Sequence, residues 1–152
     1  MSKEAIFQKY PFIKQEEISE CRLMRYDKGY KDLILVENFC QKRGFFDTEG
    51  KVIVPLEYSQ ITLGENFIIA DNSYSSVVYD YEGNNIMPVS ETYRYVSYIG
   101  KLILQGAGNG TKVYDKTGKE VEEGVVYDEV FMQHDEFLAV KLNGHWKVLY
   151  SV

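Results

Sequence analysis

Short apolar runs alternate along this chain with turns rich in Asp, Asn and Gly, and one such pattern recurs. An apolar run enters an Asp-x-x-Gly sequence three times, and the glycines at positions 50, 83 and 118 lie 33 and 35 residues apart. In each copy Asp stands first and Gly fourth, which is typical of a type I turn closed by a left-handed residue in a β-hairpin. A regular period of this length indicates one supersecondary unit copied several times.

The recurring text predicts three kinds of short strand. The strand entering the turn is expected at residues 44–46, 77–79, 112–114 and 147–150, the strand after it at 51–55, 84–88 and 119–121, and an apolar strand at 67–70, 102–104 and 137–140. Asn143-Gly144 indicates a tight hairpin before the last copy. Strands this short, separated by polar turns, predict all-β antiparallel structure.

The chain is therefore expected to form a single β-repeat domain over residues 1–152, an antiparallel meander of three to four units. The units are placed at residues 43–75, 76–110 and 111–145, with a degenerate unit at about 16–42 and a final strand at 146–152. Residues 3–10 predict a short helical cap that stops at Pro11. The expected arrangement is propeller-like, and both a closed and an incomplete ring remain open.

The best copy reads Lys-Arg-Gly-Phe-Phe-Asp-Thr-Glu-Gly-Lys-Val-Ile-Val-Pro over residues 42–55, and this text resembles the WG-repeat family. The resemblance extends over about residues 42–152, and Trp146 stands at the family's Trp position, where Arg43 and Thr111 stand in other copies. It implies a sheet-built repeat that binds or scaffolds proteins, with no shared catalytic residues.

Composition narrows the class of protein. Apolar residues make up 45% and aromatic residues 14%, with 13 Tyr, which favours β-structure first and an aromatic binding face second. Cys21 and Cys40 have neither metal-like spacing nor the density of a disulfide framework, and their redox state stays open. Because no apolar run reaches signal-peptide or membrane-spanning length, we expect a soluble cytoplasmic protein.

The charge is negative and unevenly distributed. A net charge of −6 argues against binding nucleic acid or an anionic membrane, and it is compatible with a basic protein partner. Residues 115–136 contain eight acidic residues against two lysines, so this segment alone carries a net charge of −6. It is either a solvated surface that maintains solubility or a docking surface for a cationic partner.

The sequence offers little for catalysis. His134 and His145 are its two histidines, and neither stands with Cys or carboxylates at metal-ligand or triad spacing. We therefore expect no enzyme activity, no metal and no cofactor. A deep pocket containing one of these histidines beside a carboxylate with a shifted pKa would favour an enzyme of unfamiliar type instead.

The first functional hypothesis is a non-catalytic protein-binding domain, an acidic inhibitor similar to bacterial immunity proteins that masks the basic active site of a toxic nuclease. The residues expected to contact this partner are Glu120, Glu122, Glu123, Tyr127, Asp128, Glu129, Phe131, Asp135 and Glu136. Among them, Tyr127 and Phe131 are expected to be the apolar anchors. The alternative is a generic WG-repeat scaffold or sensor that binds a peptidic or cell-envelope ligand through tyrosines.

Overall fold

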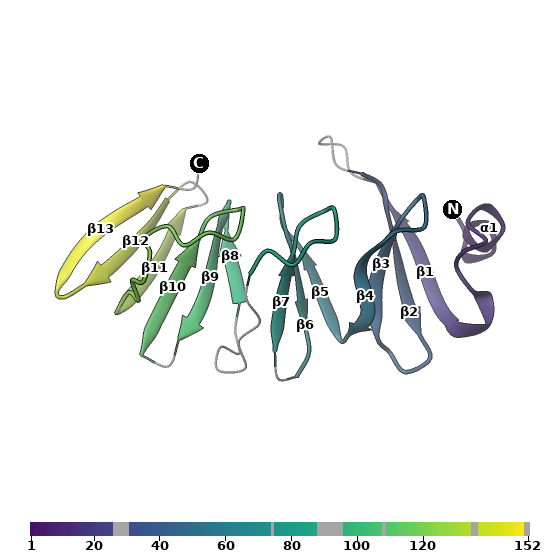
Figure 1. Cartoon of the computed structure of the whole chain (residues 1–152), viewed down its shortest axis with the longest axis horizontal. Helices are drawn as coiled ribbons and strands as arrows, with labels where there is room; N and C mark the ends of the chain where they lie inside the picture. Colours follow the sequence, from purple (N-terminus) through teal and green to yellow (C-terminus); the bar gives the residue numbers. More distant parts are fainter. Residues whose placement is uncertain (26–30, 74, 88–95, 108, 135–136, 151–152) are drawn as a thin grey trace.

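The protein is built from small antiparallel sheets that follow one another along the long axis of the molecule, with one short helix beside the first (Figure 1). The computed structural model describes residues 1–25, 31–73, 75–87, 96–107, 109–134 and 137–150. Within them the structure is all-β apart from this helix and a single 3₁₀ turn, and no sheet closes into a barrel.

The elements fall into a helical cap and four sheets. The cap comprises α1 (Lys3–Lys9) and the 3₁₀ turn η1 (Gln15–Glu17). Sheet A contains β1 (Ile18–Met24), β2 (Leu33–Asn38), β3 (Arg43–Asp47) and β4 (Val52–Tyr58), and sheet B contains β5 (Gln60–Leu63), β6 (Ile68–Asp71) and β7 (Ser76–Tyr79). Sheet C contains β8 (Val96–Ile99), β9 (Leu102–Ala107) and β10 (Gly110–Tyr114), and sheet D contains β11 (Glu129–His134), β12 (Phe137–Leu142) and β13 (His145–Tyr150).

Each sheet combines strands from two neighbouring sequence units. The unit expected at residues 43–75 supplies β3 and β4 to sheet A but β5 and β6 to sheet B, whose third strand, β7, comes from the next unit. The same offset repeats along the chain, so that β13 completes sheet D. The sequence repeat and the sheet are therefore out of phase, and neighbouring sheets are linked by shared units.

The predicted Asp-x-x-Gly turns are confirmed. Asp47 accepts hydrogen bonds from the backbone N–H groups of Glu49 and Lys51, both at 2.9 Å, and Asp80 and Asp115 bind the corresponding groups of their own turns. The closing glycines have left-handed φ angles of 95°, 90° and 86° at positions 50, 83 and 118. The hairpin at Asn143-Gly144 is confirmed as well, since both residues have positive φ, 53° and 82°.

The strand expected after each turn forms regularly only in the first unit, where it is β4. In the second unit a single bridge joins Tyr79 and Asn85, and in the third the pairing is reduced to bridges from Tyr114 to Glu120 and from Thr111 to Tyr127. Both later segments still lie along the edge of their sheet. The prediction of strands in these two segments is therefore correct about where they lie. It is wrong in expecting regular strands, because the described residues there form isolated bridges.

The turn glycines also set how closely one unit approaches the unit before it. A Cβ atom on Gly83 would lie 3.0 Å from the carbonyl oxygen of Val52, and one on Gly118 would lie 1.8 Å from that of Ile86. Gly50 faces the ring of Phe12 in the N-terminal segment, with Cδ1 at 3.2 Å from such an atom. The turns at Gly83 and Gly118 therefore pack against the preceding unit, and the turn at Gly50 packs against the N-terminal segment. A side chain at any of these glycine positions would crowd its neighbour.

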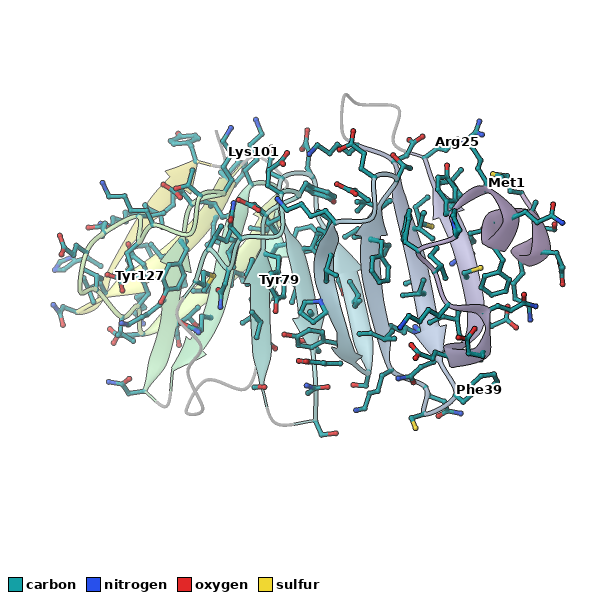
Figure 2. All side chains as sticks on the ribbon, turned by 45° about the vertical axis from the view of Figure 1, so that its right-hand side comes forward. Met1, Arg25, Phe39, Tyr79, Lys101 and Tyr127 are labelled. Atoms are coloured by element: carbon teal, nitrogen blue, oxygen red, sulfur yellow. The ribbon has the colours of Figure 1, made fainter. Side chains whose placement is uncertain are left out.

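The core consists of layers between consecutive sheets. Between sheets A and B the hydroxyl groups of Tyr58 and Tyr79 form a 2.6 Å hydrogen bond, and Figure 2 shows Tyr79 in the middle of the molecule. Phe67 and Ile103 are buried between sheets B and C. The layer between sheets C and D is centred on Tyr127. Most of the tyrosines that the structure describes are thus buried, and the hydroxyls of Tyr58, Tyr79, Tyr81, Tyr114 and Tyr127 have hydrogen-bond partners.

Helix α1 covers the free face of sheet A, as expected for a cap. Ser2 accepts a 3.2 Å hydrogen bond from the Ala5 N–H group and begins the helix, which ends at Lys9, before Pro11. Ile6 is fully buried and packs with Ile34 against the sheet. This end of the row of sheets is therefore closed by the chain itself.

We predict that Gly118→Ala destabilises the protein by about 3 kcal/mol, because the new methyl group adds a clash with Ile86 to the cost of the left-handed backbone. Gly124→Ala is the matched control. Its φ angle is similarly left-handed, at 74°, but no atom lies within 4 Å of the added Cβ. We expect that change to cost only about 1 kcal/mol. Urea unfolding of the three proteins measures both values, and equal losses would contradict the packing role of the turn.

Candidate functional site

The described part of the acidic segment predicted as a contact surface, residues 115–134, runs from the end of β10 in sheet C through β11 in sheet D. Its carboxylates are largely engaged within the chain. Glu120 pairs with Lys112 at 3.1 Å, Glu122 pairs with Lys147, and Glu129 lies 3.7 Å from Lys141. These lysines come from β10, β12 and β13, which the linear sequence does not place beside the acids.

Folding therefore brings three lysines from outside the acidic segment beside its carboxylates. Residues 110–150 contain eight acidic residues and five lysines, a net charge of −3, whereas the segment 115–136 read in isolation carries −6. The Gly124 N–H group, followed by Lys112, lowers the pKa of Glu120. Lys147, followed by the Tyr127 hydroxyl, lowers the pKa of Glu122. Both carboxylates are thus held ionised by partners in their own chain.

Tyr127, predicted as an apolar anchor for a partner, is buried within the chain. Its side chain is only 1% exposed and lies between sheets C and D, and Figure 2 labels it towards that end of the molecule. Its hydroxyl donates a 2.5 Å hydrogen bond to Glu122, and the Lys147 ammonium lies 5.8 Å from the ring centre. Burial, followed by the bond to Glu122, raises the pKa of the Tyr127 phenol. The residue packs between the two sheets and leaves almost no surface exposed.

The remaining predicted contacts divide into two groups. Glu123 and Asp128 are exposed, and Asp128 accepts a 2.9 Å hydrogen bond from the Asn143 N–H group at the turn between β12 and β13. Asp135 and Glu136 lie outside the described residues. Of the predicted carboxylates, Glu123 and Asp128 are the ones that the described structure leaves facing solvent without a lysine bound to them.

Phe131 lies on a surface that the sequence did not reveal as a unit, the outer face of sheet D. Four large apolar side chains are exposed there on β11 and β13, with exposed fractions of 56% for Phe131, 52% for Trp146, 45% for Val148 and 69% for Tyr150. On the opposite face Leu138 and Val140 are completely buried against sheet C. Sheet D thus has apolar residues on both faces, and its outer one is open.

The register of sheet D places these residues in adjacent rows. Phe131 pairs with Ala139, which in turn pairs with Val148, so one row crosses all three strands. The next row joins Glu129, Lys141 and Trp146, and the Lys141 ammonium lies 5.8 Å from the Trp146 ring centre. The outer face of sheet D therefore combines an aromatic patch with one balanced ion pair.

The sequence contained a partial signal for this face. Trp146, Val148 and Tyr150 occupy alternate positions of the last predicted strand, as one face of a strand requires. However, Leu149, on the opposite face of the strand, is apolar too. Alternation alone therefore does not say which face is buried. Only the packing of sheet D on sheet C decides that.

Other candidate features lie apart from this end. A cavity of about 410 Å³ on sheet A is lined by Met1, Glu20, Cys21, Arg22, Leu35, Glu37 and Arg43. Arg43 donates a 2.9 Å hydrogen bond to Glu37 there, so part of its charge is balanced. None of the predicted partner contacts lines this cavity.

The residues considered for chemistry do not converge. His145 is exposed at the start of β13, and the His134 side chain lies outside the described part of the structure. Cys21 and Cys40 are both free. Over the described ranges, no three His, Cys, Asp or Glu side chains come together as a metal-binding group. A search of the same ranges finds no helix with the length and hydrophobicity needed to cross a membrane.

Comparison with known proteins supports the presence of the repeat. The model of the WG containing repeat family matches residues 44–70, which include β4, β5 and most of β3 and β6. No curated protein matches the chain. The chain is therefore an all-β protein of antiparallel sheets that contains a WG-type repeat.

Two solved structures of Hsv2 from Kluyveromyces lactis are similar to it. The first has 12% identity and a TM-score of 0.46 and covers 89% of this chain and 48% of that one. The second, described as having a complete loop 6CD, has 14% identity and a TM-score of 0.45 and covers 78% of this chain and 44% of that one. The present chain thus spans about half the length of these structures.

We predict that Glu122 contributes to stability only when ionised. Its folded pKa is lowered, so the unfolded chain binds the proton more readily, and the contribution is present above the ordinary carboxyl value of 4.5 and is lost as the pH falls below it. Glu122→Gln should therefore flatten the acid side of the stability profile. Urea midpoints at neutral and mildly acidic pH measure this, with the exposed Glu123→Gln as the control. Parallel profiles for Glu122→Gln and the unsubstituted protein would contradict it.

Proposed function

We propose that this chain is a non-catalytic protein-binding module that docks its partner on the outer face of sheet D. The observation that supports this most directly is the exposed cluster of Phe131, Trp146, Val148 and Tyr150 on one face of a sheet. Contiguous exposed apolar surface of this kind marks interaction sites, because it costs free energy in water. Trp and Tyr are also the residues that most often dominate the binding energy of protein interfaces.

The border of this face defines the chemistry of the partner. Asp128 lies beside the first residue of β11, and its carboxylate faces solvent next to the β12–β13 turn. Glu123 is exposed, and the loop that contains it is joined to β13 by the ion pair between Glu122 and Lys147. A complementary partner is a protein with an apolar centre and a few basic residues around it.

Masking of a basic toxic nuclease, as immunity proteins do, is a narrower form of this proposal. The exposed carboxylates of Glu123 and Asp128 favour it. The lysines bound to Glu120, Glu122 and Glu129 weaken it, because those acids already have cations of their own chain. Apolar docking is therefore the main element of recognition, and charge orients the partner at the border.

The scaffold hypothesis based on tyrosines includes the same surface. Among the described tyrosines, Tyr58, Tyr79, Tyr81 and Tyr127 are buried, whereas Tyr98 on sheet C and Tyr150 on sheet D are exposed. We also propose that the sheets form an incomplete propeller-like array. The support is that each sheet packs face to face on the next and that sequence units and sheets are out of phase.

We predict that Trp146→Ser combined with Tyr150→Ser weakens partner binding at least about tenfold, because both side chains belong to the proposed centre. Phe39→Ser is the matched control. Phe39 is 71% exposed but lies at the opposite end of the molecule (Figure 2). The three proteins are used as bait in a lysate of the native host, the captured protein is identified by mass spectrometry, and its affinity is then measured by calorimetry. Equal affinity for all three would overturn the proposed face.

We predict that Glu123→Gln combined with Asp128→Asn weakens the same complex severalfold at low salt and has little effect at high salt, because both charges lie at the solvated border. Affinity measured over a salt series distinguishes the two contributions. If high salt alone dissociates the complex of the unsubstituted protein, charge and not apolar contact makes the main contribution to binding. The nuclease-masking form of the proposal then gains support.

A further inference from the structure

The outer edge of β13 differs from the corresponding edges elsewhere in the molecule. β13 is the last copy of the strand represented earlier by β3, β7 and β10. In each earlier copy, a following segment lies along the free edge. β4 pairs with β3, Asn85 bridges to β7, and Glu120 and Tyr127 bridge to β10. Within the described residues, β13 pairs with β12 alone.

This edge has the properties of a pairing site. The six residues from His145 to Tyr150 include neither Pro nor Gly, and all but Leu149 are exposed. Alternate N–H and C=O groups of an edge strand point away from its neighbour and require another strand or water. Proteins often protect such edges with a lysine. Here the Lys147 ammonium is instead bound to Glu122 and directed at the Tyr127 ring, on the side facing sheet C.

We propose that two copies of this chain associate by antiparallel pairing of β13 with β13 about a two-fold axis at Val148. In this register Val148 faces its own copy, Trp146 faces Tyr150, and Lys147 faces Leu149. Aromatic side chains opposite one another stabilise a strand pair. A two-fold interface must be complementary to itself, and this register meets that condition.

The neighbouring register is unfavourable. An axis at Lys147 would place Trp146 opposite Val148 and so remove the pairing of Trp146 with Tyr150. On the outer face, moreover, the charges of Glu129 and Lys141 balance within one copy. An identical neighbouring face is therefore not repelled, as it would be if the acidic segment carried its full charge there.

Pairing at this edge joins the two D sheets into one continuous sheet and leaves their outer faces open. The aromatic patch of one copy then continues into that of the other. The association does not rest on the proposed hetero-partner, which would bind the face and not the edge.

Cross-linking tests the register directly. In a background carrying Cys21→Ser and Cys40→Ser, mild oxidation of Val148→Cys should give a disulfide-linked dimer, since residues directly opposite in antiparallel strands lie within disulfide reach. Trp146→Cys is the matched control. Its two copies would lie four positions apart, about 13 Å, which is too far for a disulfide. Equal cross-linking at both positions, or none at 148, would overturn the proposal.

Sedimentation velocity over a wide concentration range supplies a second test that does not depend on cysteine chemistry. Trp146→Lys with Tyr150→Lys should weaken self-association about tenfold or more, and so should Trp146→Glu with Tyr150→Glu. A mixture of the two variants should form a heterodimer, because lysines then face glutamates. Both positions are exposed, so the fold is expected to persist, and circular dichroism checks this.

The outcomes separate this proposal from the proposed function. Suppose that the protein is monomeric at all concentrations and that Trp146→Ser with Tyr150→Ser still abolishes capture of the partner. This result would overturn self-pairing and leave the docking proposal intact. A dimer that captures nothing would support self-pairing and remove the docking proposal. A monomer in which Val148→Cys cross-links to an extended segment of another protein would overturn self-pairing in favour of a strand supplied by that protein.

Discussion

The architecture depends on the close approach between the Asp-x-x-Gly turns of the second and third units and the unit before each of them. At Gly118 this approach leaves no room for a Cβ atom, which would lie 1.8 Å from the Ile86 carbonyl oxygen, and at Gly83 the contact with the Val52 carbonyl oxygen would be tight, at 3.0 Å. The same glycines need a left-handed backbone to close the turn. One residue type thus satisfies two constraints, the shape of the turn and the spacing between units, and the layered core follows from that spacing.

The two ends of this row of layers are not equivalent. At sheet A, helix α1 covers the free face with Ile6 and completes the last layer. At sheet D the outer face keeps Phe131, Trp146 and Tyr150 in water, and the edge strand β13 has pairing capacity. A layered protein must cover or tolerate such a face, because apolar surface and unpaired backbone both cost free energy. This asymmetry is why both proposals concern the same end of the molecule.

The electrostatics of sheet D changes the picture suggested by charge counting. Glu122 and Lys147 are 25 positions apart in sequence, yet they form an ion pair beside Tyr127. Lysines from three strands enter the acidic region in this way and halve its excess charge. In the proposed docking mode, what remains for recognition is a modest acidic border around an apolar centre, which would orient a partner more than attract one.

Local features were within reach of the sequence, because they depend on neighbouring residues. Asp47 and Gly50 specify their turn through bonds that span a few residues, Asn143 and Gly144 do the same for the last hairpin, and Pro11 limits the first helix. The all-β class and the repeat followed from these features. The assignment of strands to sheets did not follow from them, because each sheet takes strands from two sequence units. The burial of Tyr127, the lysines paired with the acids and the exposed face bearing Trp146 also required tertiary structure. A strand with apolar residues on both sides can bury either one, and only the position of the neighbouring sheet determines which side meets water.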